Sequence, residues 1–498
     1  MAGSLFRTKS IDRLMADGEE GGESGLKRTL GPWSLVALGI GAVIGAGLFV
    51  RTAAAIAERA GPSVTISFIV AGIGCAFAGL CYAEFASMIP IAGSAYTYSY
   101  ATMGELLAWI IGWDLVLEYA VGAATVAIAW SEYFNKVLEY IGLHVPYQWS
   151  HSPFQTMMDV SGAATNVHGI INIPAVVILL GLTALLVRGT QESALVNGLI
   201  VITKVAIVIA VIILGWGFIN PVNHTPYIPE PTMYTGIDHV AHAYGGIMGI
   251  LGAAGVVFFA FIGFDAVSTA AQEAKNPARD MPIGILGSLV ICTLLYVLFS
   301  YVLSGIAPVD FFRHAGAEAS VTQAIETYMP GYGWLAKSVT IAILLGFSSV
   351  ILVMLLGQSR VFYSMSRDGL VPKVFSDVHP VHRTPYKSNW LFFVFTSLFA
   401  AFIPGDIVGD MTSIGTLFAF ILVCIGVWIM RRRRPDIQRG FTVPALPVVA
   451  TLGVLVCASM IFGLGWTNWL RLIVWLVIGL AVYFTYGRKH SLLNRADG

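Results

Sequence analysis

Several ionisable residues lie inside apolar runs of this sequence, where a charged side chain is costly unless it has a partner or a task. The candidates for binding or coupling are Lys204, Asp114, Glu118 and Asp265. Asp114 and Glu118 are four residues apart, so on a helix both lie on one face. Buried groups of this kind can exchange protons or bind a charged ligand.

A glycine-rich stretch, residues 39–47, offers a second kind of chemistry through its backbone. Four of these nine residues are glycine, and each costs a helix interior about 1 kcal/mol relative to alanine. We therefore expect the helix to break here and to expose N–H and C=O groups. Close packing of helices through small residues is the alternative.

A similar stretch follows at residues 252–265. Gly252, Gly255 and Gly263 interrupt an apolar run, and Asp265 follows. Paired interruptions of this kind indicate a transporter's binding site, because half-helix N–H groups suit a carboxylate and unwound carbonyls suit an ammonium. A zwitterionic α-amino acid presents both groups on one carbon atom. The expected carboxylate ligands are the amides of Gly45, Ala46 and Gly47, and the expected ammonium ligands are the carbonyls of Val43, Ile44, Phe259, Ala260 and Ile262.

Lys204 is the candidate for proton coupling. It lies about a dozen residues into its run, near the middle of a bilayer at 1.5 Å rise per residue. Desolvation favours the neutral form of a buried amine, which lets it exchange a proton near neutral pH. Ser348 or Ser349 is expected to hydrogen-bond it or to enlarge the pocket. The alternatives are a permanently charged lysine on helix carbonyls, and serines that bond only their own i−4 carbonyls.

The three carboxyl groups are candidates for recognising a cationic side chain. Asp114, Glu118 and Asp265 would do so electrostatically. Alternatively, Asp265 caps a second half-helix and Glu118 is protonated or paired within the bundle. The sequence does not separate these roles.

The elements that position these residues must lie in lipid. The 498 residues are 57% hydrophobic and 11% charged, with a mean hydropathy of +0.78. A soluble protein has about 25% charged residues, so the chain is expected to be polytopic in a lipid bilayer. A net charge of zero argues against a nucleic-acid partner. The cysteines and histidines form no ligand pattern, and no nucleophile–base set converges, so neither a metal site, a cofactor nor an enzyme is expected.

Runs of about 20 apolar residues predict about twelve membrane-spanning helices. They are residues 33–57, 63–88, 104–134, 168–187, 193–219, 246–273, 283–306, 336–363, 389–403, 407–430, 443–463 and 467–486. With the N-terminus in the cytoplasm, 21 of the 28 lysines and arginines fall on one side and 6 on the other, with Lys204 inside a span. The positive-inside rule then places both termini of this multi-pass protein in the cytoplasm, at the cytoplasmic membrane.

The two interrupted runs are the first and the sixth. Because five is an odd number, a second set of five spans begins on the opposite side of the membrane, which predicts an inverted repeat. The expected organisation is an N-terminal segment 1–32, a first repeat 33–219, a second repeat 246–430, two further spans within 443–486 and a tail 487–498.

Several short segments resemble a known superfamily. Residues 41–49, 89–98 and 261–266 with Asn276 and Pro277 are similar to motifs of the amino acid–polyamine–organocation transporters. Residues 104–106 with Trp130 and Ser131, residues 366–370 and residues 413–417 resemble more narrowly its cationic amino acid transporter branch. The resemblance runs from about Pro32 to the twelfth span.

The resemblance implies an all-α, LeuT-type fold with a 5+5 inverted repeat, broken helices 1 and 6, and alternating access. In proton-coupled relatives a lysine of the fifth span takes the place of a sodium ion. For this chain that implies Lys204 near the carbonyls of Gly41 and Ile44 and near the hydroxyl of Ser349 or Ser348.

We therefore expect a secondary transporter that moves L-amino acids, cationic or small neutral, together with protons. The proton is the coupling ion. An amino acid exchanger and a non-transporting amino acid sensor are the alternatives. The preferred amino acid, the stoichiometry and any accessory membrane subunit or homo-oligomer are left open.

Overall fold

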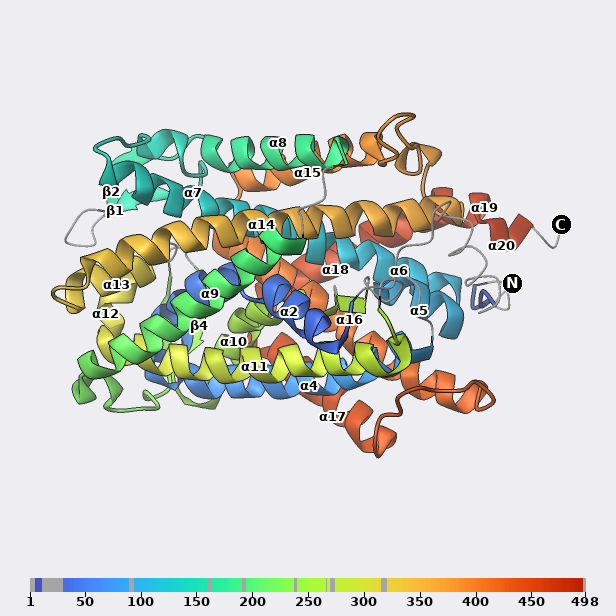
Figure 1. Ribbon diagram of the computed structural model, residues 1–498, viewed down its shortest axis with the longest axis horizontal. Coiled ribbons are helices and arrows are strands. Elements are labelled where there is room, and N and C mark those ends of the chain that lie inside the picture. Colours follow the sequence, from blue (N-terminus) through green and yellow to red (C-terminus); the bar gives the residue numbers. More distant parts are fainter. Residues whose placement is uncertain are drawn as a thin grey trace.

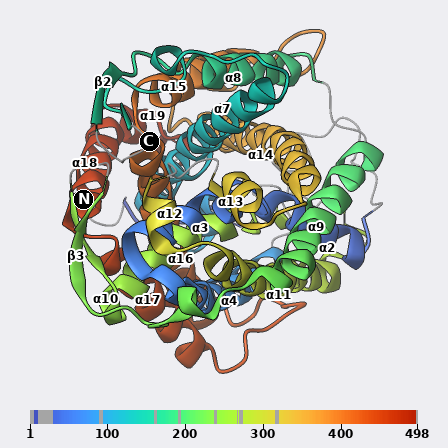
Figure 2. The same cartoon turned by 90° about the vertical axis from the view of Figure 1, so that its left-hand side faces the viewer.

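A computed structural model describes most of the chain as a bundle of long helices (Figures 1 and 2). The described residues are 5–10, 30–88, 94–158, 164–189, 194–236, 240–265, 267–268, 274–314 and 320–495. Most of the expected N-terminal segment 1–32 lies outside them, as do residues 89–93 and 266 of the motifs above.

The helices follow one another along the chain. Those up to residue 218 are α2 (Pro32–Val43), η2 (Gly47–Arg51), α3 (Thr52–Ala55), η3 (Ile56–Ala60), η4 (Gly61–Ser63), α4 (Val64–Met88), α5 (Ser94–Thr102), α6 (Glu105–Val116), η5 (Leu117–Val121), α7 (Gly122–Tyr140), η6 (Tyr147–Trp149), α8 (Ile173–Val187), α9 (Ala194–Gly215) and η7 (Trp216–Phe218). Those after it are α10 (Gly246–Val257), η9 (Phe258–Phe261), α11 (Pro277–Ile306), α12 (Val309–His314), α13 (Ser320–Tyr328), α14 (Gly333–Arg367), α15 (Tyr386–Phe402), α16 (Gly405–Arg433), α17 (Leu446–Gly463), α18 (Trp466–Val482), η12 (Tyr483–Gly487), α19 (Arg488–His490) and α20 (Leu492–Arg495).

The helical interpretation of the apolar runs is confirmed for a polytopic membrane protein. Every predicted run contains a helix, and within the described residues eight helical segments are long and apolar enough to cross a membrane. The helices α2 and α8 and the segment Gly246–Phe261 are apolar but shorter. The helices α2 and α10 are short because each ends at a break in the middle of its apolar run.

Two connections of this all-α fold contain short strands. Short antiparallel ribbons form between β1 (Thr156–Met158) and β2 (Ala164–His168), and between β3 (Thr232–Thr235) and β4 (Ala241–Tyr244). The fourth run accordingly begins its helix at Ile173 rather than at 168. Asn172 caps that helix by accepting a hydrogen bond from the Ala175 N–H at 3.2 Å, which fixes the start.

The bundle has two ends and two groups of helices. We call the end with residues 5–10 and α20 the terminal face, and the end with the ribbons the opposite face (Figure 1). In both views α7, α8, α14 and α15 pack together on one side, and α4, α10, α11 and α17 on the other (Figures 1 and 2). The helix α9 contacts both α2 and α14.

An ion pair on the opposite face predicts a pH-dependent stability. The imidazole Nε2 of His151 lies 2.8 Å from the Glu132 carboxylate at the end of α7. Burial lowers the pKa of His151, but the Glu132 carboxylate and a hydrogen bond to the Tyr147 carbonyl together raise it by more, so the net pKa lies above its ordinary value. The stabilisation is therefore complete below the unfolded pKa of about 6.5 and is lost as the pH rises through the folded pKa.

We expect His151→Gln to lower the thermal unfolding midpoint by roughly 1–3 °C at pH 5.5 and to leave it unchanged at pH 8.5. Thermal melts of the purified protein at both pH values measure this effect. An equal loss at the two pH values would show that His151 stabilises the loop by packing alone.

Candidate functional site

The first helix break lies where the glycine-rich stretch predicts it. Helix α2 ends at Val43, and Ile44 is extended with ψ of 102°, its N–H giving the last helical hydrogen bond to Ile40 at 2.9 Å. A π-helical turn, η2, resumes at Gly47. The N–H groups at the start of a helix have no carbonyl of their own helix to bond, so the amides of Gly45 to Gly47 can bind an anion.

The second break lies against the first. The turn η9 ends at Phe261, Ile262 is non-helical, and Gly263 has a φ of +111°. A Cβ on Gly263 would lie 2.9 Å from the Ala42 carbonyl oxygen, and one on Gly47 would overlap the backbone of Ala260. Glycine is therefore needed at both positions for the two breaks to meet.

Tyr296 of α11 joins the two breaks, and sequence reasoning missed it. Its hydroxyl lies 3.0 Å from the Val43 carbonyl oxygen and 2.9 Å from that of Ala260. These are two of the expected ammonium ligands. One phenol has one proton and each carbonyl has two lone pairs, so both carbonyls keep acceptor capacity for a ligand. The Phe259 carbonyl, also an expected ligand, accepts from the Ile262 N–H at 3.3 Å.

We expect Tyr296→Phe to lower transport about 10-fold, because two buried carbonyls at the helix ends lose their shared donor. Uptake by the purified protein in liposomes measures the effect. Tyr82→Phe is the matched control, since the buried Tyr82 hydroxyl has no hydrogen-bond partner among the described residues. Equal activities of the two variants would contradict a bridging role for Tyr296.

Lys204 contacts the first break. Its Nζ donates a hydrogen bond of 2.9 Å to the Gly41 carbonyl, one of the last carbonyls of α2, which the helix end leaves without a helical donor. Lys204 is 3% exposed, and its side chain passes Gly346 of α14, where a Cβ would lie 2.6 Å from Cε. The expected contact with Gly41 is thus present, whereas the one with Ile44 stays a prediction.

The two candidate serines of α14 lie in different surroundings. The Ser348 hydroxyl donates to the Leu344 carbonyl at 2.9 Å and accepts from Trp130 Nε1 at 3.1 Å. Ser349 is buried and lies three residues after Gly346, hence on the face that Lys204 crosses. The structure therefore favours Ser349 as the neighbour of Lys204, whereas the Ser348 hydroxyl bonds its own i−4 carbonyl and Trp130.

The three carboxyl groups lie close to one another. Asp114, Glu118 and Asp265 are each at most 1% exposed, and Glu118 is near enough to Asp265 for the two to interact. The Tyr119 hydroxyl donates to Asp265 at 2.8 Å. Whether Asp265 caps a following half-helix depends on residue 266 and residues 269–273, outside the described part of the chain.

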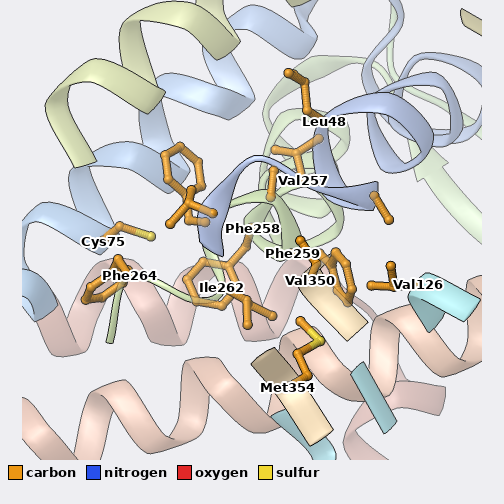
Figure 3. Close-up of a cluster of buried hydrophobic side chains, with 14 of the residues drawn as sticks. Leu48, Cys75, Val126, Val257, Phe258, Phe259, Ile262, Phe264, Val350 and Met354 are labelled. Carbon is orange, nitrogen blue, oxygen red and sulfur yellow. The ribbon is translucent and has the colours of Figure 1, made fainter. Parts of the chain in front are cut away.

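Apolar side chains surround the breaks. Figure 3 shows Phe259 and Ile262 of the second break in one buried cluster with Val350 and Met354 of α14. Val350 lies against the first break, 3.2 Å from the position of a Cβ on Gly45. A ligand held by the backbone groups of both breaks would place its own side chain among these residues.

On the opposite face, charged residues hold the first break in place. Arg51, at the end of η2, is 2% exposed and forms ion pairs with Asp406 at 3.2 Å and with Asp410, both on α16. Asn468 of α18 donates to Asp410 at 3.0 Å. Residues 41–50 are all buried, so this conformation is closed around the breaks.

Paired helix breaks, a lysine bound at the first of them and an envelope of apolar helices are typical of a membrane transporter. The family and the relatives below show that the protein is a transporter and not an enzyme. Residues 30–486 match the amino acid permease family. The chain belongs to this family, within the amino acid–polyamine–organocation superfamily.

Relatives match over nearly the whole chain. It is 44% identical over 495 residues to "Branched-chain amino acid permease BcaP" of Bacillus subtilis (strain 168), covering 99% of this chain and 100% of that protein. It is 40% identical over 492 residues to "Methylthioribose transporter" of the same strain, covering 99% and 100%. It is 28% identical over 610 residues to "Cationic amino acid transporter 4, vacuolar" of Arabidopsis thaliana, covering 99% and 97%.

Proposed function

We propose that this protein is a proton-coupled symporter of L-amino acids in the cytoplasmic membrane. The observation that carries the proposal is the 2.9 Å hydrogen bond from the Lys204 Nζ to the Gly41 carbonyl at the first helix break. A neutral amine would not hold that carbonyl by a charge-assisted bond. The protonation state of Lys204 would therefore set how firmly α2 is held two residues before the substrate site.

The backbone groups of the two breaks would hold the amino acid itself. The amides of Gly45, Ala46 and Gly47 would bind its carboxylate, and the carbonyls of Val43, Ile44, Phe259, Ala260 and Ile262 its ammonium. Because both half-helices converge here, the substrate would sit between the helix group of α11 and that of α14. Movement of the two helix groups relative to each other would open the site alternately to the two sides of the membrane.

A neutral, branched aliphatic side chain fits the surroundings better than a cationic one. Apolar side chains cluster around the breaks, namely those of Phe259, Ile262, Val350 and Met354 (Figure 3). The 44% identical relative is named a branched-chain amino acid permease, which supports the same preference. Asp114, Glu118 and Asp265 would then contribute negative charge near the substrate ammonium instead of reading a cationic side chain.

The proposal includes the membrane topology. Twelve spans would form a LeuT-type fold, with repeats 33–219 and 246–430 followed by two spans within 443–486. The terminal face would be cytoplasmic, since lysines and arginines concentrate on the side of the termini. The ion pairs of Arg51 would then close the site towards the outside.

Uptake into liposomes tests the proposal. With an inward proton gradient and no internal amino acid, we expect labelled leucine to accumulate. Isoleucine and valine should compete about 10-fold more strongly than lysine and arginine. Uptake that requires internal amino acid would instead show an exchanger, and binding without any uptake would show a sensor.

A further inference from the structure

The connection between α7 and α8 carries almost no charge. Residues 141–172 include one acidic residue, Asp159, and neither lysine nor arginine. In a soluble protein about one residue in four is charged. The structure describes residues 141–158 and 164–172 of this connection, which contain η6 and the strands β1 and β2. We call these described residues the apolar ribbon.

Large apolar side chains of the apolar ribbon are exposed. Phe154 is 72% exposed, and Trp149, Met157 and Ile170 are 43%, 43% and 49% exposed. Apolar side chains that gather on a surface mark a site of interaction with another molecule or with a membrane. The ribbon therefore offers a surface that suits an apolar partner.

The backbone of the apolar ribbon has hydrogen-bond partners within the ribbon itself. Besides the pairing of β1 with β2, the Ile170 N–H donates to the Gln148 carbonyl at 2.8 Å and the Gly169 N–H to the Gln155 carbonyl at 3.0 Å. An irregular loop is excluded from lipid mainly because its N–H and C=O groups would lose their partners. A ribbon that bonds these groups internally can lie at a membrane surface at little cost.

The exposed apolar surface continues along α8. Ile173, Val177 and Leu180 are 42%, 57% and 44% exposed and follow one another at helical spacing, so they form one face. Because α8 is an apolar helix of a membrane protein, this face contacts lipid. Ile170 of the ribbon directly precedes the helix, so the lipid-facing surface runs from α8 onto the ribbon (Figure 1).

Helix α8 is too short to cross the hydrocarbon core by itself. Its 15 residues extend about 22 Å, whereas the core is about 30 Å thick. Its C-terminal end meets a polar loop of the terminal face, where the Thr384 hydroxyl donates to the Val187 carbonyl at 2.7 Å. The missing apolar length therefore lies at the N-terminal end of α8, next to the ribbon.

The apolar ribbon lies at the rim of the bundle. Figure 2 looks onto the opposite face and shows β2 at its edge, near α8 and α15, whereas α12 and α13 lie near the middle. The Asn172 N–H donates to the Ala401 carbonyl of α15 at 3.1 Å, which holds the end of the ribbon there. A segment at the rim meets the surrounding bilayer, and a segment near the middle meets water.

We propose that the apolar ribbon is a membrane-surface anchor whose partner is phospholipid. Trp149, Phe154 and Ile170 insert between the lipids of the adjacent leaflet, at the boundary of head groups and acyl chains, where tryptophan is favoured. The ribbon thereby supplies the apolar length that α8 lacks. Because residues 141–172 contain no lysine or arginine, the contact does not require anionic head groups. On the topology proposed above, the leaflet is the outer one.

Spin labels on the full-length protein in phosphatidylcholine liposomes test the anchor. The five native cysteines are buried, so a nitroxide reagent reacts with an introduced cysteine alone. In Phe154→Cys and Ile170→Cys, the nitroxide should collide more often with oxygen, which dissolves in lipid, than with a water-soluble nickel chelate. The ratio of the two collision rates should be at least about 3-fold higher than for the control Thr327→Cys.

Two reference positions calibrate the labels. Thr327 is exposed on α13, near the middle of the opposite face, and reports water, whereas Val177→Cys on the exposed face of α8 reports lipid (Figure 2). The inference is overturned if both ribbon labels collide with the nickel chelate as often as the Thr327 label. It is also overturned if both are shielded from both reagents, since a protein partner or a second copy would then cover the ribbon. No transport is measured, so the outcome is independent of proton coupling.

Discussion

Lys204→Met is expected to abolish proton-driven accumulation of amino acid while the protein stays folded. Methionine keeps the length of the side chain but cannot donate to the Gly41 carbonyl or carry a proton. A lysine near the bilayer centre costs about 2.5–3.5 kcal/mol to insert, so its loss does not weaken the bundle by itself. Uptake under an inward proton gradient should fall to simple equilibration of leucine, and its pH dependence should disappear.

Lys204→Arg tests whether the positive charge at this position is sufficient or whether the side chain must also release its proton. Arginine retains the positive charge and the donor for Gly41, but it does not release its proton in proteins. We therefore expect this variant, too, to lose proton-driven accumulation. Normal pH dependence in Lys204→Met would contradict the coupling role, even if total uptake were reduced.

Gly47→Ala is expected to reduce substrate binding and transport by at least about 10-fold. A Cβ at this position would overlap the Ala260 backbone, so the two breaks must move apart. Overpacking of this kind costs roughly 1–3 kcal/mol, and here the displaced groups are the proposed ligands of the carboxylate and the ammonium. Thermal shift with leucine measures binding, and liposome uptake measures transport.

Gly31→Ala is the control for this substitution. Gly31 precedes α2 at the terminal face, and a Cβ there would meet no atom within 4 Å. It changes the same residue type without touching the breaks, so leucine binding should be normal. If Gly47→Ala also binds leucine normally, the amides near Gly47 are not the carboxylate site.

The positions of both breaks could be predicted because glycine is unfavourable in a helix interior. The clustering of Gly39, Gly41, Gly45 and Gly47 therefore required an explanation, and the helix does end at Val43. Lys204 could be identified for a similar reason, because a lysine in lipid needs a partner. Its bond to Gly41 is present, and its role in coupling stays a prediction.

The residues that join distant segments could not be predicted. Tyr296 bonds to carbonyls 36 and 253 residues away, and an aromatic residue in an apolar run gives no sign of such a contact. The ion pair of Lys9 with Asp368 joins residues that are 359 apart and lie in polar segments, where most charges are solvated. Adjacent serines, such as Ser348 and Ser349, can be separated only once the helix face towards Lys204 is known.

The most direct test is the movement of protons with the amino acid. In liposomes that contain the protein and a pH-sensitive dye, with equal pH on both sides, external leucine is added. We expect the lumen to acidify as leucine enters, and we expect Lys204→Met to abolish this acidification. Leucine entry without any change of lumenal pH in the unmodified protein would contradict proton-coupled symport.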